Sequence, residues 1–212
     1  MTEVAGIVLA AGSSTRMGLP KQLLPAGSQN LLDRSLTQAL QSDLHSLALV
    51  LGFRAREIEQ SLGNSSRRHP KLRIIVNEKY EEGISASLVA GVKALERDYE
   101  NLMVLLADMP YVTTPLINSL IHAYLRSGLP LGAVLTGGRR THPVIVGRRF
   151  FKEIHSLKGD TGARHLFLHH PDQVCLVEPR EHFDDADLDT MEEYLEFKNT
   201  LTKQPADDAP KT

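Results

Sequence analysis

Apolar residues recur along the chain in short runs that polar positions hardly interrupt. These runs occupy residues 6–10, 47–51, 72–76, 102–107, 131–135, 144–146 and 174–177. A nearly continuous apolar run of this length is typical of a β-strand covered on both faces, because a strand with one face in water alternates apolar and polar positions. The pattern therefore predicts strands that lie in the middle layer of a domain.

Between most of these runs, the apolar positions return every three or four residues, which is the period of an amphipathic helix. Such stretches cover residues 31–41, 55–62, 85–97, 115–126 and 161–169. Alternating strands and helices predict a three-layer α/β domain with a mostly parallel, doubly wound, Rossmann-like sheet. Ligands of such domains bind at the carboxyl ends of the strands, so we expect the functional residues in the loops that follow them.

The length of the chain is enough for one well-buried core, and we expect a single domain over residues 1–202. Residues 203–212 lack large apolar side chains and are predicted to form a disordered tail. No apolar run is long enough for a signal or membrane helix. With Cys175 as its single cysteine, the chain cannot form an internal disulfide, and we expect a cytoplasmic location.

The charge composition gives no reason to expect a polyanionic partner. The formal net charge is -2, so the chain as a whole does not attract nucleic acid or an anionic membrane. The arginine pairs at 67–68, 139–140 and 148–149 are separate and are not accompanied by aromatic platforms for stacking bases, and we interpret them as solvated faces. Any anion must therefore be bound by local groups.

The loop after the first predicted strand has the composition of an anion-binding turn. Small residues at positions 11–14 allow a tight turn whose backbone amides can point at a ligand. Arg16 and Lys21 follow, and both side chains are suited to gripping phosphate. The loop is therefore predicted to bind phosphate.

Two common phosphate-binding motifs do not match this loop. Gly18 is followed by Leu-Pro-Lys, whereas a Walker A motif requires Gly-Lys-Ser or Gly-Lys-Thr. Ser14 stands where a dinucleotide-binding G-x-G-x-x-G motif needs its second glycine. An ATPase of that class and a dehydrogenase are both excluded.

Asp108 directly follows the most hydrophobic predicted strand, and Pro110 prevents the backbone from continuing in the sheet. A carboxylate at this edge is a suitable ligand for Mg²⁺, which binds one or two protein carboxylates together with phosphate oxygens. The alternative is that Asp108 caps the helix that begins near Thr113, but the gap is long for a cap. We therefore expect Asp108 to bind metal.

Together these motifs resemble those of a known family. Residues 9–21 are similar to the signature Leu-Ala-Ala-Gly-x-Ser-x-Arg-Met-Gly-x-x-Lys of the molybdopterin-type nucleotidyltransferases. Segments similar to the molybdenum cofactor cytidylyltransferase branch follow in the same order at 20–25, 83–87, 107–110, 142–144, 159–164 and 187–190. The resemblance covers residue 4 to about residue 195, and it implies the nucleotide-diphospho-sugar transferase type of fold.

The resemblance implies roles for individual residues. It implies Arg16, Lys21 and Asp108 as catalytic residues, and Asp108 and Asp187 as ligands of Mg²⁺. The residues that it implies for nucleotide binding are Leu9, Ala10, Ala11, Gly12, Ser13, Arg16, Lys21, Asn77, Gly83 and Ser87. Related guanylyltransferases usually have glycine where this chain has Ala11, so the alanine favours CTP.

A second metal ligand and the acceptor site leave alternatives open. Asp189 is a lesser candidate for the metal, because Asp189 or Thr190 could be the N-cap of the helix that follows. The resemblance implies acceptor binding by His142, Asp160 and Arg164. From the residues alone, Asp160 is explained as a turn and helix start, and Arg164 is equally well a solvated helix residue.

The residues together with the family resemblance predict a Mg²⁺-dependent cytidylyltransferase, whose acceptor is the one that the resemblance implies. It would move CMP from CTP to the phosphate of a molybdopterin-type acceptor, release pyrophosphate and pass its product to a molybdoenzyme. One alternative is the same chemistry on methylerythritol phosphate or a sugar phosphate. The other is a non-catalytic chaperone that binds nucleotide or cofactor.

Overall fold

The computed structural model describes residues 3–14, 17–180 and 183–203. The strands are β1 Val4–Ala10, β2 Pro25–Ala26, β3 Gln29–Asn30, β4 Leu47–Leu51, β5 Leu72–Val76, β6 Asn101–Leu106, β7 Leu131–Thr136, β8 Arg139–Gly147 and β9 Val174–Val177. The α-helices are α1 Leu31–Leu40, α2 Ala55–Ser61, α3 Asn64–Arg67, α4 Ile84–Leu95, α5 Thr114–Ser127, α6 Phe151–Ser156, α7 Arg164–His169 and α8 Met191–Lys203. Short 3-10 turns include η2 Lys21–Leu23 and η3 Tyr80–Glu82.

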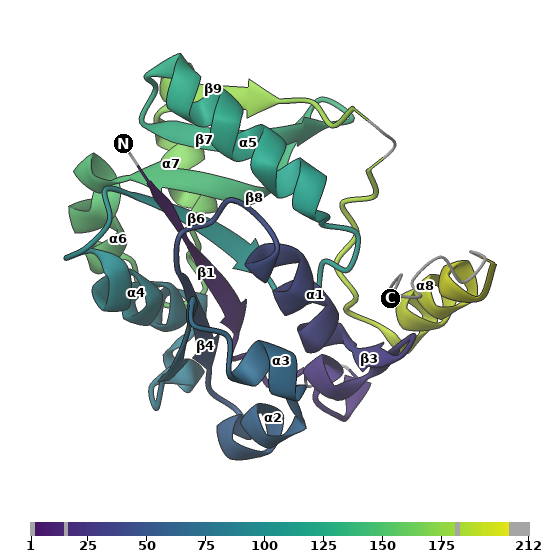
Figure 1. The fold of residues 1–212 in the computed structure, drawn as a ribbon. Coiled ribbons are helices and arrows are strands. Elements are labelled where there is room, and N and C mark those ends of the chain that lie inside the picture. Colours follow the sequence, from purple (N-terminus) through teal and green to yellow (C-terminus); the bar gives the residue numbers. More distant parts are fainter. Residues whose placement is uncertain (1–2, 15–16, 181–182, 204–212) are drawn as a thin grey trace.

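The main sheet has the strand order β5-β4-β1-β6-β8-β7-β9 (Figure 1). Neighbouring strands pair in parallel except at β8, which is antiparallel to both β6 and β7. This confirms the predicted mostly parallel, doubly wound sheet. The chain passes from β1 to β4 and β5 on one side and then returns to β6 on the other, so the strand order reverses beside β1. A ligand cleft is expected at that reversal.

Helices cover both faces of the sheet, which explains the continuous apolar runs. Val4 and Val8 of β1 belong to a buried cluster that includes residues of α1 and α5. Ala5 and Ile7 point to the opposite face and belong to a cluster with residues of α4, α6 and α7. Because successive strand residues point to opposite faces, both sets of positions must be apolar.

The helix that follows Asp108 has its own cap, so Asp108 is not needed for that purpose. The Oγ1 atom of Thr113 accepts a hydrogen bond from the amide of Leu116 at 3.4 Å, at the start of α5. The helix ends at Gly128, whose φ of 66° closes it in the left-handed conformation. The alternative that Asp108 caps this helix is therefore wrong.

The predicted helix over residues 161–169 was wrong in its first turn. The observed helix α7 begins at Arg164, and its N-cap, Ala163, makes no side-chain cap bond. Residues 159–162 form an irregular turn instead, with Gly159 at a φ of 61°. The turn predicted at Asp160 is confirmed, whereas the helix start predicted there is wrong. The short elements α3, α6, β2 and β3 were not predicted, because they are too short to show a period.

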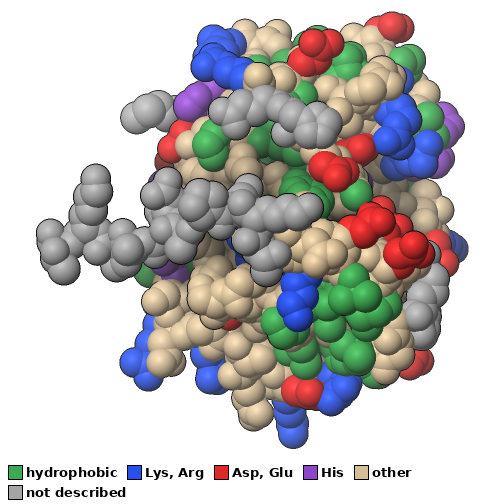
Figure 2. Space-filling model, turned by 90° about the vertical axis from the view of Figure 1, so that its right-hand side faces the viewer, with side chains coloured by type: hydrophobic (Ala, Val, Ile, Leu, Met, Phe, Trp, Pro, Cys, Tyr) green, Lys and Arg blue, Asp and Glu red, His purple; other side chains and the backbone are tan. Residues whose placement is uncertain are grey.

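The C-terminal helix α8 lies beside the small β2–β3 hairpin, away from the middle of the sheet (Figure 1). It continues through Lys203, so the first residue of the predicted tail is helical, and residues 204–212 lie outside the described residues. Within the described ranges, no helix combines the length and apolar composition needed to cross a bilayer. Acidic and basic side chains are mixed on the face shown in Figure 2.

Tyr124 of α5 is a buried polar anchor of the core. Its side chain is 4% exposed, and its hydroxyl donates a hydrogen bond to Oδ1 of Asn101 at 2.6 Å, at the start of β6. Burial is the main reason that the pKa of Tyr124 rises to about 12 from its ordinary value of 10.0. The folded protein therefore keeps this proton at pH values where the unfolded chain loses it.

We predict that Tyr124 makes the stability of the protein fall as pH rises from about 10 to about 12. Below pH 10 both states hold the proton and its contribution is complete; above 12 both have lost it. Tyr124→Phe should cost about 1–3 kcal/mol at neutral pH, because Asn101 loses its donor. Melting temperatures of both proteins across this pH range test this, and the variant should show a weaker alkaline decline. An equal decline in both would contradict it.

Candidate active site

A cavity of about 770 Å³ opens at the carboxyl ends of β1 and β6, beside the reversal of strand order. Many residues that the sequence assigned to nucleotide or metal binding line it. They are Leu9, Ala10, Ala11, Gly12, Ser13, Lys21, Gly83, Ser87, Asp108 and Asp187. Arg16, which the sequence also placed here, lies outside the described residues.

Three carbonyl groups of the loop after β1 accept hydrogen bonds from other parts of the protein. Gln22 is 3% exposed, and its side-chain amide donates to the carbonyls of Ala10 at 3.0 Å and Gly12 at 3.1 Å. The carbonyl of Ala11 accepts from the amide of Phe53 at 3.1 Å. Carbonyl oxygens repel an anion, so a loop whose carbonyls are already bonded is suited to present its amides to phosphate.

Sequence reasoning missed Gln22, although it directly follows Lys21 in a segment that already carried the resemblance. The side chain connects the loop after β1 to η2, the turn that carries the lysine. The amide of Lys21 adds a second connection, because it donates to Oγ of Ser14 at 3.2 Å. These bonds fix the position of Lys21 relative to the loop.

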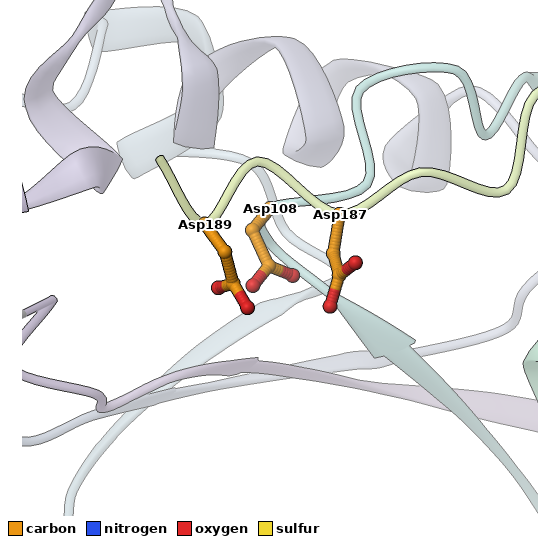
Figure 3. Close-up of side chains that lie close together, drawn as sticks. All are labelled: Asp108, Asp187 and Asp189. Atoms are coloured by element: carbon orange, nitrogen blue, oxygen red, sulfur yellow. The ribbon is translucent and has the colours of Figure 1, made fainter. Parts of the chain in front are cut away.

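Three aspartates gather around the ammonium group of Lys21. Asp108, Asp187 and Asp189 each offer a carboxylate oxygen, and these oxygens lie within 4.8 Å of one another (Figure 3). The Nζ atom of Lys21 contacts Oδ2 of Asp108 and lies 3.0 Å from Oδ1 of Asp189. The arrangement brings together a cation and the oxygen donors that a hard divalent ion prefers.

Burial and charge act in opposite directions on these groups. Burial alone would lower the pKa of Lys21, but the adjacent Asp108 and Asp189 carboxylates outweigh that effect and raise it above its ordinary value. Burial, together with the nearby Asp189 and Asp108 carboxylates, raises the pKa of Asp187. The cluster therefore keeps the ammonium charged and disfavours ionising a further carboxylate.

Hydrogen bonds between Glu193 and the backbone fix the segment before α8. Oγ1 of Thr190 accepts from the amide of Glu193 at 3.2 Å, and the Glu193 carboxylate accepts from the amides of Thr190 at 2.7 Å and Asp189 at 2.8 Å. This is a capping box with Thr190 as the N-cap. Of the two caps that the sequence allowed, Thr190 is the observed one, and the Asp189 carboxylate contacts Lys21.

The opposite wall of the cavity is formed by the turn that begins α4. Asn77 and Ser87 are both buried, and Nδ2 of Asn77 donates to Oγ of Ser87 at 3.0 Å. Ser87 lines the cavity, whereas Asn77 lies behind it and orients its hydroxyl group. Gly83, at a φ of 99°, packs against the backbone of Gly159.

A second cavity of about 520 Å³ adjoins the first, and Asp187 lines both. His142 and Arg164, two of the residues assigned to the acceptor, line this second cavity. Asp160, the third, lies instead in the first cavity, next to the position of Gly83. The structure thus brings together two of the three predicted acceptor residues.

Two further arginines in the second cavity were missed by sequence reasoning. Arg139 and Arg140 lie on β8, which is longer than the predicted strand and extends over this cavity. Arg139 contacts Asp185 at 3.1 Å, and Arg140 donates to the carbonyl of Phe167. Both residues are exposed, as the interpretation of a solvated face predicted, and they also line this cavity. Burial lowers the pKa of His142 to about 4, so its imidazole is neutral at pH 7.

Comparison with known proteins identifies the family. A model of the MobA-like NTP transferase domain matches residues 6–174. The chain belongs to this family. It is 28% identical over 205 residues to the molybdenum cofactor cytidylyltransferase of Escherichia coli (strain K12), a match that covers 96% of this chain and 100% of that protein.

Two other relatives of this MobA-like domain carry different names. The purine catabolism protein PucB of Bacillus subtilis (strain 168) is 31% identical over 196 residues, covering 89% of this chain and 93% of that protein. The nicotine blue oxidoreductase of Paenarthrobacter nicotinovorans is 28% identical over 200 residues, covering 90% and 94%. The family is therefore established, while the names of its members do not agree on one substrate.

Solved structures confirm the α/β nucleotidyltransferase fold of the MobA-like domain. One solved structure is that of a protein from Mycobacterium sp. strain JC1, which is a homologue of a Mycobacterium tuberculosis protein. It superposes with a TM-score of 0.81 at 26% identity, covering 94% of this chain and 97% of that one. A protein of Mycobacterium tuberculosis H37Rv in complex with manganese has a TM-score of 0.76 at 22% identity, covering 93% and 98%.

We predict that Gly83→Ala will disrupt the wall of the cavity in this MobA-like domain. An added Cβ would overlap the carbonyl group of Gly159 and lie 2.8 Å from Oδ1 of Asp160, at a φ unfavourable for alanine. The expected cost is about 1–3 kcal/mol of stability, with weaker binding of nucleoside triphosphate. Melting temperature and a nucleotide titration measure both effects.

Gly162→Ala is the matched control, because its new Cβ would lie 3.7 Å from the nearest atom, in Ile84. It should leave both quantities close to wild type. If the two variants behaved alike, the contact between Gly83 and Gly159 would not shape the wall.

Proposed function

We propose that this MobA-like domain moves CMP from CTP to the phosphate of a molybdopterin-type acceptor and releases pyrophosphate. The observation that carries the proposal is the position of the acidic cluster. Lys21 and the three aspartates stand where two adjoining cavities meet, and Asp187 lines both. A nucleotide in one cavity and an acceptor in the other would meet at this cluster.

In the proposed reaction, an oxygen of the acceptor phosphate forms a bond to the α-phosphorus of CTP. The bond from that phosphorus to the oxygen bridging to the β-phosphate breaks, and pyrophosphate leaves with the electron pair. The protein needs no covalent intermediate, because holding the two anions in line and neutralising their charge supplies the rate enhancement.

The loop after β1 and Lys21 would hold the triphosphate. The bonded carbonyls of Ala10, Ala11 and Gly12 leave the loop suited to contact phosphate through its amides. The ammonium group of Lys21 would stabilise the negative charge that develops on the leaving pyrophosphate. Arg16 is assigned to the same task by the sequence.

The residues of the acidic cluster fit a divalent cation, which we propose to be Mg²⁺. Asp108, Asp187 and Asp189 provide carboxylate oxygens within 4.8 Å of one another, the hard donors that Mg²⁺ and Mn²⁺ prefer. The manganese in the structural neighbour supports a divalent ion at a site of this fold. When bound, the cation would supply positive charge that offsets the negative charge of the phosphates.

Several features favour CTP over the other nucleotides. Ala11 stands where guanylyltransferases of the resembling family usually have glycine, and Gly83 and Ser87 form the wall assigned to the base. The likeness to the cytidylyltransferase of Escherichia coli extends over almost the whole chain. These observations support a pyrimidine in the first cavity.

The second cavity would receive the acceptor. Because burial lowers the pKa of His142 to about 4, its imidazole is neutral at pH 7 and can form a hydrogen bond with an acceptor. Arg164, Arg139 and Arg140 provide positive charge for an anionic molecule. A molybdoenzyme as recipient of the product and a cytoplasmic location stay predictions.

We predict that Lys21→Ala lowers kcat by about 10²–10³-fold, the usual cost of removing one group that stabilises transition-state charge. Pyrophosphate release from CTP, Mg²⁺ and the acceptor measures it. Lys152→Ala, on the exposed side of α6, is the control and should keep wild-type turnover. Full turnover by the Lys21 variant would refute the mechanism.

We predict that CTP with Mg²⁺ raises the melting temperature more than GTP, ATP or UTP does, because a ligand that binds only the folded state stabilises it according to its affinity. Chelating the cation should reduce the shift. A larger shift with GTP would overturn the assignment of the base.

Pyrophosphate release with different acceptors tests the two alternatives. Release only with methylerythritol phosphate or a sugar phosphate would show that the proposed acceptor is wrong, and CTP binding without pyrophosphate release would indicate the chaperone alternative.

A further inference from the structure

The segment that the family comparison matches ends at residue 174, but the candidate site continues beyond it. Asp187 and Asp189 follow that segment, and Asp189 is the residue next to the N-cap of α8. Leu188, between the two aspartates, is 1% exposed and lies in one buried cluster with Tyr194 and Phe197 of the helix. The position of the two carboxylates is therefore tied to the position of α8.

A second contact ties α8 to the segment that carries Lys21. The hydroxyl of Tyr194 donates to the carbonyl of Pro25 at 2.9 Å, four residues after the lysine. The Tyr194 side chain is 5% exposed and packs in the same cluster as Met17 and Leu24. Met17 precedes Lys21 and Leu24 follows it, so the cluster that contains Tyr194 includes residues on both sides of the lysine.

A third contact ties α8 to the segment that carries Asp108. The ring of Phe197 meets the ring of Tyr111 edge to face, with centroids 5.5 Å apart and an interplanar angle of 87°. Tyr111 lies three residues after Asp108. The guanidinium group of Arg34 lies 5.9 Å from the centre of the Phe197 ring, and Phe197 is 1% exposed. This ring therefore has a defined place against the body of the domain.

We propose that α8 is a positioning element of the active site, and that Tyr194 is the positioning residue that links it to the turn carrying Lys21. The helix contacts the segments after Lys21 and Asp108, and Asp189 lies at its start. One rigid element thereby sets the relative positions of groups from three distant parts of the chain. The inference rests on the proposed function, because it assumes that these groups bind a metal and the phosphates.

A helix with a purely structural role would also be buried in this way. The structural role and the positioning role differ in the metal affinity that they predict for the folded variant. If Tyr194 only adds stability, Tyr194→Phe lowers the melting temperature and leaves the folded protein with unchanged metal affinity. If it positions the cluster, the folded variant binds metal more weakly. The ring of phenylalanine keeps the apolar contacts and removes only the hydrogen bond to Pro25.

The test measures Mn²⁺ binding directly, by the electron paramagnetic resonance signal of free Mn²⁺, at a temperature well below the melting transitions. We expect Tyr194→Phe to raise the Kd for Mn²⁺ about 3- to 10-fold, which is the scale of one lost hydrogen bond behind the ligands. Phe197→Leu, which loses the contact with Tyr111, should act in the same direction. Leu195→Ala is the control on the same helix, because its side chain is 50% exposed and lies outside the buried cluster.

Kinetics give a second measure. Tyr194→Phe should lower kcat for pyrophosphate release at saturating CTP, and excess Mn²⁺ should restore part of the loss, whereas Leu195→Ala should match wild type. Unchanged Mn²⁺ affinity in both the Tyr194 and Phe197 variants would overturn the inference. Asp108→Asn separates this failure from that of the proposed function. If Asp108→Asn also keeps full Mn²⁺ affinity, the proposed metal site is wrong, and if it loses affinity while Tyr194→Phe does not, only the role of α8 is wrong.

Discussion

The ion pairs of Lys21 with Asp108 and Asp189 are the interaction on which the site depends. Three carboxylates with oxygens within 4.8 Å of one another repel each other, and partial burial strengthens that repulsion because water screens it less. A cation between them is what makes the arrangement stable in the folded protein. Burial would lower the pKa of Lys21, but the Asp108 and Asp189 carboxylates raise it; burial is the main reason that the pKa of Asp187 is raised, and the same two carboxylates add to the effect.

The sheet brings these groups together although they are far apart in sequence. Leu9 of β1 pairs with Leu106 of β6, so the loop after β1 and the turn containing Asp108 leave the sheet side by side. The backbone amide of Leu188 then donates to the carbonyl of Asp108 at 3.0 Å, which holds the last two aspartates against the first. The site is thus built from one strand pair and one returning segment, and α8 fixes that segment from outside.

The sequence was informative where burial determines the residue type. The strands of the sheet are covered on both faces, so their apolar runs could be located from the sequence alone, and a carboxylate directly after such a run must lie at the edge of the sheet. The capping role of Thr190 also had a local signal, because Glu193 stands at the position that a capping box requires. With that signal, Asp189 could have been placed in the acidic cluster with Asp108 and Asp187 rather than at a cap.

Other positions depend on contacts between distant segments and had no local signal. Asp160 lies at the first cavity because Gly159 packs on Gly83, and no pattern within either segment records that contact. Arg139 and Arg140 face the second cavity because β8 is longer than its apolar run and extends over α7. Sequence periodicity shows which face of an element is buried, but it does not show which other segment covers that face.

The charge balance at the cluster also couples the two ligands that the proposed reaction needs. Among the described residues that line the first cavity, the carboxylates of the acidic cluster outnumber the ammonium group of Lys21, and Arg16 lies outside the described residues. Each of these carboxylates repels the negative charge of a triphosphate, whereas each attracts a divalent cation. Each ligand must therefore strengthen the binding of the other, and by thermodynamic reciprocity the two effects are equal in size. A site of this composition favours the nucleotide together with its metal ion over either one alone.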